Sequence, residues 1–88
     1  MLKLLDFSAT WCPPCQLMIP VVETIKEEFK GKLEVEEINI EENQAKAQEF
    51  SVMSIPTFVI LKEGKEVDRK MGAIGESAFR EWIAKFLN

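Results

Sequence analysis

The stretch "LKLLDFSATWCPPC" (residues 2–15) joins a short apolar run to the two cysteines of the chain, Cys12 and Cys15. The run "LKLLDF" has the length and composition of a strand buried on both faces. Pro13 then fits the first position of a helix, where its missing N–H costs no hydrogen bond. The cysteines are therefore predicted to lie where a buried strand is followed by a helix.

The rest of the sequence predicts further strands and helices in alternation. From Pro13 to about Lys30, apolar residues recur at helical spacing, and Gly31 stands where a helix-ending glycine is common. Strands are predicted at 33–40, 57–62 and 66–71, the last two joined as a hairpin through "EGK", and helices at 41–50 and from Glu76 onward.

The order β-α-β-α-β-β-α predicts an α/β fold. Strands separated by helices are expected to pair in parallel through right-handed crossovers, and the final hairpin should add an antiparallel edge. We therefore expect one mixed four-stranded sheet with helices on both faces. A chain of 88 residues has room for one modest core, so a single domain over residues 1–88 is expected.

Composition excludes several classes of function. The net charge is −4 and no cluster of Lys and Arg stands out, so neither nucleic acid nor an anionic membrane is an expected partner. No apolar run approaches the roughly 20 residues of a membrane helix, and the opening "MLKLLDF" is too short for a signal peptide. We therefore expect a cytoplasmic protein. Because the chain has no histidine, Ser–His and Cys–His catalytic pairs are excluded.

A Cys-x-x-C pair can bind a metal, form a structural disulfide or carry out redox chemistry. A structural zinc site needs four ligands, usually Cys or His, so here it could be completed only between two chains. A disulfide across so short a loop should stabilise the fold by less than the about 3 kcal/mol of a 15-residue loop. Both structural alternatives are therefore weak, and no metal site is predicted.

Redox chemistry is favoured by the position of the pair at a helix N-terminus. The partial positive charge and free amides there stabilise a thiolate at Cys12 and lower its pKa. Because Pro14 also lacks an N–H, the Cys15 amide is the nearest backbone donor to that sulfur. Cys15 lies one turn inside the helix and is expected to be more buried and less acidic. We therefore predict that one thiol attacks and the other resolves.

The chain resembles the thioredoxin family from end to end. The resemblance rests on "LLDFSATWCPPC", the helix proline Pro20, "INIEEN", "SIPTFVILKEGKEV" and "MGAIGE". It implies a thioredoxin-like fold with a nucleophilic Cys12 and a resolving Cys15. It also implies that Asp6 is a buried carboxylate beneath the disulfide, which would accept the proton from Cys15.

The same resemblance implies a groove for substrate beside the disulfide. Pro56 matches a cis-proline that faces the disulfide, and the segment after the last strand completes the groove. The residues assigned to substrate binding are Trp11, Pro13, Ile55, Pro56, Gly72 and Ala73.

Four features depart from the family pattern. The family's first strand and helix are absent, and the dipeptide between the cysteines is Pro-Pro where Gly-Pro is usual. Ser8 replaces a common aromatic residue, and Glu37 stands where a lysine is usual. Because the dipeptide and nearby charges tune the reduction potential, these changes bear on the direction of electron flow.

Glu37 has two possible environments. Period two places it on the same face of its strand as Leu33 and Val35, toward the layer that contains Asp6. Either the strand end frays and Glu37 reaches water, or two carboxylates lie together beneath the disulfide. In the second case desolvation and like charge would hold one proton to higher pH, and the pair would titrate as a unit. We assign Glu37 a role in modulating the pKa of Asp6.

The predicted activity is the reduction of protein disulfides by dithiol exchange, without a bound cofactor. Disulfide-containing proteins would be the substrates, a thioredoxin-reductase-type protein would supply electrons, and the protein would act as a monomer. One alternative is a glutaredoxin-like protein recharged by glutathione, although "MGAIGES" lacks the Gly-Gly-x-Asp arrangement of that family. Another is a redox-inert thioredoxin-like interaction module, against which the intact cysteines and Asp6 argue.

Overall fold

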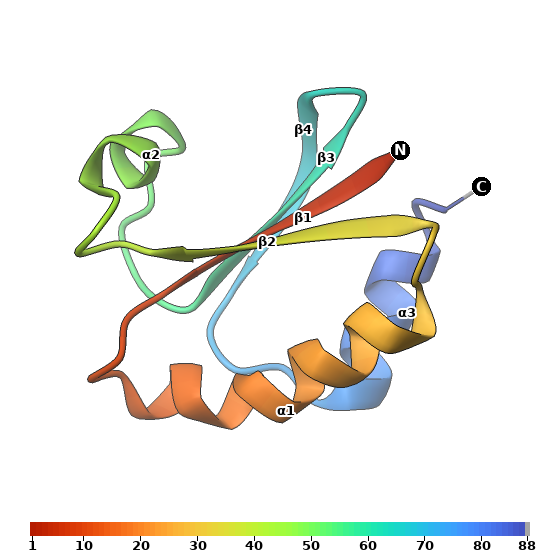
Figure 1. Cartoon of the computed structure of the whole chain (residues 1–88), viewed down its shortest axis with the longest axis horizontal. Coiled ribbons are helices and arrows are strands. Elements are labelled where there is room, and N and C mark those ends of the chain that lie inside the picture. Colours follow the sequence, from red (N-terminus) through yellow and green to blue (C-terminus); the bar gives the residue numbers. More distant parts are fainter. Residues whose placement is uncertain (88) are drawn as a thin grey trace.

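The computed structural model describes residues 1–87, and its elements follow the predicted order. One sheet contains all four strands in the order β2-β1-β3-β4 (Figure 1). The elements are β1 (Leu2–Ser8), α1 (Pro13–Glu28), β2 (Leu33–Asn39), α2 (Gln44–Glu49), β3 (Thr57–Lys62), β4 (Lys65–Met71) and α3 (Glu76–Ala84). The second helix is shorter than the predicted range 41–50.

Helices cover both faces of the sheet, as expected. Helices α1 and α3 lie on one face, and α2 lies on the other (Figure 1). Leu4 of β1 and Phe58 of β3 pack in the core beneath α1 and α3, whereas Leu5 and Val59 pack toward α2. Alternate side chains of a strand point to opposite faces, so β1 contributes to both cores. The prediction of a first strand buried on both faces is confirmed.

The direction of β3 was predicted wrongly. Strands β1 and β2 pair in parallel, but β3 pairs antiparallel with β1. The physical reason is the length of α2, whose six residues span only about 9 Å. A strand of seven residues, such as β2, extends over about 23 Å. The short helix does not carry the chain back to the start of β2, so β3 enters the sheet from the end at which β2 finishes (Figure 1).

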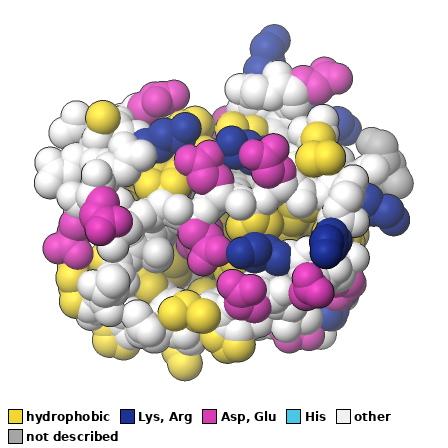
Figure 2. Space-filling view, viewed as in Figure 1, with side chains coloured by type: hydrophobic (Ala, Val, Ile, Leu, Met, Phe, Trp, Pro, Cys, Tyr) yellow, Lys and Arg dark blue, Asp and Glu magenta, His cyan; other side chains and the backbone are white. Residues whose placement is uncertain are grey.

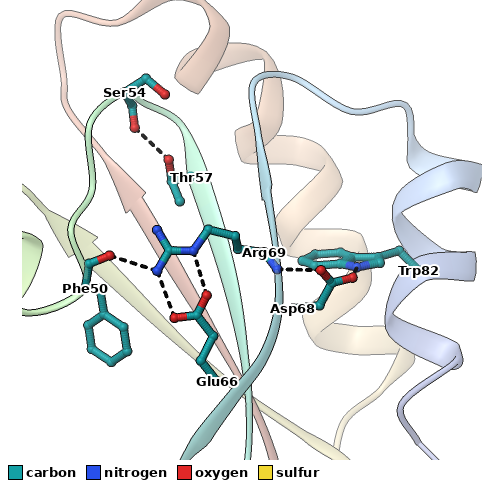
Figure 3. Close-up of polar contacts among 7 residues, drawn as sticks. All are labelled: Phe50, Ser54, Thr57, Glu66, Asp68, Arg69 and Trp82. Carbon is teal, nitrogen blue, oxygen red and sulfur yellow. Dashed lines mark hydrogen bonds and ion pairs between the residues drawn. The ribbon is translucent and has the colours of Figure 1, made fainter.

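Two polar contacts of β4 attach it to helical segments on opposite faces of the sheet (Figure 3). The Arg69 guanidinium donates a hydrogen bond of 2.8 Å to the carbonyl of Phe50, the residue that caps the end of α2. The same guanidinium forms an ion pair with Glu66. Trp82 of α3 donates its indole N–H to the Asp68 carboxylate at 2.8 Å. This hydrogen bond is the main cause that lowers the pKa of Asp68. The edge strand is thereby fixed to helical segments on both faces.

Replacement of Trp82 by Phe tests the bond between α3 and β4. The change removes the indole donor from a buried position and leaves Asp68 without that partner. A hydrogen bond to a charged group contributes about 1.5–3 kcal/mol, so we expect the free energy of unfolding to fall by about 2 kcal/mol. Urea unfolding at neutral pH measures it. Trp11→Phe is the matched control, since Trp11 is exposed; an equal loss in both variants would contradict the assignment.

Candidate active site

Cys12 and Cys15 form a disulfide at the N-terminus of α1. Cys12 is the N-cap residue, its backbone is extended, and two prolines follow it at the start of the helix. The Cys15 N–H donates to the Cys12 sulfur at 3.2 Å, which is the donor expected from the two prolines. A negative charge on this sulfur would be stabilised both by that amide and by the helix dipole.

The prediction that Cys15 is more buried than Cys12 was wrong. Cys12 is 3% exposed and Cys15 is 4% exposed. Both belong to one small cluster with Ala9, against which Ile40 and Ile55 pack. The disulfide holds the two side chains in the same layer, so neither is the outer one. Exposure in the disulfide form therefore does not distinguish the two cysteines.

Three segments that are distant in sequence meet at this end of the sheet. They are the junction between β1 and α1, the loop before β3 and the loop after β4 (Figure 1). The Ile55–Pro56 peptide bond is cis, and the Ile55 carbonyl oxygen lies 4.0 Å from the Cys12 sulfur. The Gly72 N–H donates to the Pro56 carbonyl at 2.8 Å, and its φ of +88° favours glycine there. The structure thus brings residues 55–56 and 72 together beside the disulfide.

Apolar side chains are exposed around this junction. Trp11, directly before Cys12, is 63% exposed, and Pro13 and Ala73 are also exposed, whereas Pro56 is buried. Two exposed methionines that the sequence analysis did not assign, Met53 and Met71, adjoin the same loops. Both lie within two residues of Ile55 or Gly72 in the sequence, and this proximity was the signal that could have assigned them to the site. In Figure 2, hydrophobic side chains also lie along the lower margin of the molecule, over α1.

Asp6 lies on β1 beneath the disulfide layer and is 8% exposed. It lines a cavity of about 130 Å³ together with Cys15 and Glu37. Burial raises the pKa of Asp6 to about 6, and the negative charge of Glu37 acts in the same direction. Asp6 is therefore a carboxyl group that changes its charge close to neutral pH, in the cavity that Cys15 also lines.

The environment of Glu37 combines parts of the two that were expected. The strand does not fray, because β2 remains paired with β1 and Glu37 lies opposite Asp6. The Glu37 side chain is nevertheless 49% exposed, and its carboxylate lies 3.0 Å from the Lys26 ammonium of α1. The two carboxylates share a cavity, but a cation accompanies one of them. Lys26 was not predicted as a site residue, because its spacing in the sequence placed it on the polar face of α1.

Comparisons with known proteins agree with this geometry. The Thioredoxin family model matches residues 1–85. The chain belongs to the thioredoxin family. A thioredoxin of Rickettsia felis is 39% identical over 82 residues, which cover 93% of this chain and 78% of that protein. Thioredoxin 1 of a Nostoc species is 38% identical over 84 residues, covering 96% of this chain and 78% of the relative.

A solved thioredoxin structure shares the fold. A mutant thioredoxin from Halobacterium salinarum aligns over 99% of this chain and 75% of its own with a TM-score of 0.91 and 37% identity. With the family and the Cys12–Cys15 pair both present, the protein is a dithiol-disulfide oxidoreductase. Within residues 1–87, no helix is long and apolar enough to cross a membrane.

Replacement of Asp6 by Asn should stabilise the protein at alkaline pH. A buried acid with a raised pKa destabilises the native state once it ionises. The free energy of unfolding therefore falls as pH rises from 3.8, the pKa of Asp6 in the unfolded chain, toward about 6, its pKa in the native state. That interval corresponds to about 3 kcal/mol. We expect the free energy of unfolding of Asp6→Asn to exceed that of the wild type by about this amount at about pH 8 and to equal it near about pH 4. Urea unfolding of the oxidised protein measures the difference.

Asp68→Asn is the matched control for this experiment. The pKa of Asp68 is lowered, chiefly by the Trp82 hydrogen bond, so its ionised form stabilises the native state and that contribution is lost as pH falls below 3.8. The control should therefore be less stable than the wild type at about pH 8. A destabilised Asp6→Asn at that pH would contradict the account of Asp6.

Proposed function

We propose that this protein reduces disulfide bonds in other proteins, with Cys12 as the attacking thiol and Cys15 as the resolving thiol. The observation that supports this assignment is the hydrogen bond from the Cys15 N–H to the Cys12 sulfur at the helix N-terminus. It favours the thiolate at Cys12 once the disulfide is reduced. Cys15 does not cap the helix, so the same stabilisation is not available to it.

The exchange takes place in two steps. The Cys12 thiolate attacks one sulfur of the substrate disulfide, which breaks that bond, forms a mixed disulfide and releases one substrate thiolate. Cys15 then loses its proton and attacks the Cys12 sulfur, so that the Cys12–Cys15 disulfide forms and the second substrate thiolate leaves. Two electrons pass to the substrate. A reductase of the thioredoxin-reductase type would return two electrons to the pair.

Asp6 is the proposed acceptor of the Cys15 proton. Both side chains line the same cavity, and the pKa of Asp6 is about 6 because of burial and the Glu37 charge. Above that pH the Asp6 carboxylate can accept a proton, and below it the carboxyl group already carries one. The rate of the resolving step should therefore rise with pH through about 6.

The substrate is proposed to bind in extended form beside the Ile55 carbonyl, in the manner of an added strand. This carbonyl lies 4.0 Å from the Cys12 sulfur. Pro56 and Gly72, which a hydrogen bond joins, form the adjoining wall. Trp11, Pro13 and the neighbouring Ala73 would supply exposed contact surface.

We further propose a monomer that works in the cytoplasm as an electron carrier. A protein that reduces disulfides needs a compartment in which thiols are kept reduced, and the cytosol provides one. Recharging by a thioredoxin reductase rather than by glutathione would separate this proposal from the glutaredoxin-like alternative. If neither thioredoxin reductase nor glutathione reduced the protein, the redox-inert interaction module would be the remaining alternative.

The roles of the two cysteines can be separated by trapping. Cys12→Ser should abolish reduction of a protein disulfide, because it removes the attacking sulfur. Cys15→Ser should attack and then stall, so that a covalent adduct with substrate accumulates through Cys12. Non-reducing electrophoresis with mass spectrometry identifies the linked cysteine. If an adduct formed through Cys15 in the Cys12→Ser protein and none formed in the Cys15→Ser protein, the two roles would be interchanged.

Trp11→Ala should weaken substrate binding without unfolding the protein. An exposed aromatic side chain next to the attacking sulfur offers contact area that a folded monomer does not need. A loss of about 1 kcal/mol of contact energy predicts a KM for a protein substrate that is about fivefold higher, with unchanged stability. Steady-state kinetics with a protein and with a small disulfide measure it. An equal effect on both substrates would contradict a contact surface for proteins.

A further inference from the structure

Lys26 of α1 lies beside the cavity of Asp6 without lining it. Its ammonium nitrogen is 3.0 Å from Glu37 and 3.7 Å from Glu23, so it lies between an acid of β2 and an acid of its own helix. Glu37 lies directly opposite Asp6 on the neighbouring strand and lines the cavity with it. Glu37 therefore connects a surface cation to the buried carboxyl group.

We propose that Lys26 is a positioning residue for the exchange reaction: it holds the Glu37 carboxylate toward α1 and offsets its charge, so that Asp6 can ionise. This inference rests on the proposed role of Asp6 as proton acceptor. It assigns a function to an ion pair between a helix and a strand that the sequence pattern did not indicate.

The charge state of Asp6 depends on which charged groups face it. Among the described residues that line its cavity, Glu37 is the other charged side chain. On the opposite side, β3 places the apolar Phe58 next to Asp6. Lys70 of β4 lies one strand further away and is 5.8 Å from the ring of Trp82. The charge nearest to Asp6 in this arrangement is therefore that of Glu37.

The ion pair acts against the effect of Glu37. The negative charge of Glu37 is the second cause, after burial, of the raised pKa of Asp6. A cation 3.0 Å from Glu37 attracts this carboxylate and reduces the field that Asp6 experiences. Without Lys26, the Glu37 carboxylate would lose the partner that holds it toward α1. Asp6 would then hold its proton to higher pH, and fewer molecules could accept the proton of Cys15 near neutrality.

The experiment is a double-mutant cycle read from the titration of Asp6 by carboxyl NMR in the oxidised protein. The variants are Lys26→Gln, Glu37→Gln and the pair together. Lys30→Gln is the matched control, because it removes one positive charge near the end of the same helix, outside the ion pair of Lys26. A second readout is the pH profile of single-turnover disulfide reduction for each variant.

Lys26→Gln should raise the Asp6 midpoint by about 0.5 pH unit, the size expected for a partly exposed pair. Glu37→Gln should lower the midpoint, and adding Lys26→Gln to it should have no further effect. Lys30→Gln should leave it unchanged. An unchanged midpoint in Lys26→Gln, or an equal rise with and without Glu37, would overturn the proposal, since Lys26 would then not act through Glu37.

The titration and the kinetics test different statements. The midpoint is measured without substrate, so it decides the role of Lys26 whatever the reaction does. If the midpoint moves as expected and the pH profile of reduction moves with it, both proposals are supported. If the midpoint moves and the profile does not, proton transfer to Asp6 is contradicted, while the control of Asp6 by Lys26 stands.

Discussion

Strand β1, buried between β2 and β3, determines where the other parts of the active site lie. This strand is hydrogen-bonded to β2 on one edge and to β3 on the other, and its apolar side chains are buried on both faces. Its course fixes where the chain leaves the sheet, and thus where Cys12 begins α1. It also places Asp6 in the cavity that Cys15 lines. One rigid strand therefore sets the positions of the helix N-terminus, the disulfide and the buried carboxyl group.

The sequence was sufficient to predict the order of the elements, the layers and the Cys-x-x-C at the start of a helix, because each follows from local periodicity and from proline chemistry. It failed for β3, since the direction of a strand depends on how far the preceding helix can carry the chain. It also failed for the burial of Cys12, which depends on the packing of Ala9 and Ile55 against the disulfide. The ion pair of Lys26 with Glu37 joins residues of different elements, so no helical or strand pattern could reveal it.

The charges beneath the disulfide reflect a compromise between stability and chemistry. An apolar residue at the place of Asp6 would fit the core better, because the ionised carboxylate is costly there. A carboxyl group with a pKa of about 6 can, however, exchange a proton close to neutral pH. Glu37 moves this pKa upward, and Lys26 offsets Glu37 from the surface. The balance is set by three side chains from three different elements.

We propose that the helix N-terminus, rather than exposure, makes Cys12 the reactive thiol. The most direct measurement is the rate at which a small alkylating reagent labels each cysteine of the reduced protein at neutral pH, followed by peptide mapping. Although the two residues are almost equally buried in the disulfide form, we expect Cys12 to be labelled long before Cys15, because only Cys12 caps the helix. Equal rates, or faster labelling of Cys15, would contradict it.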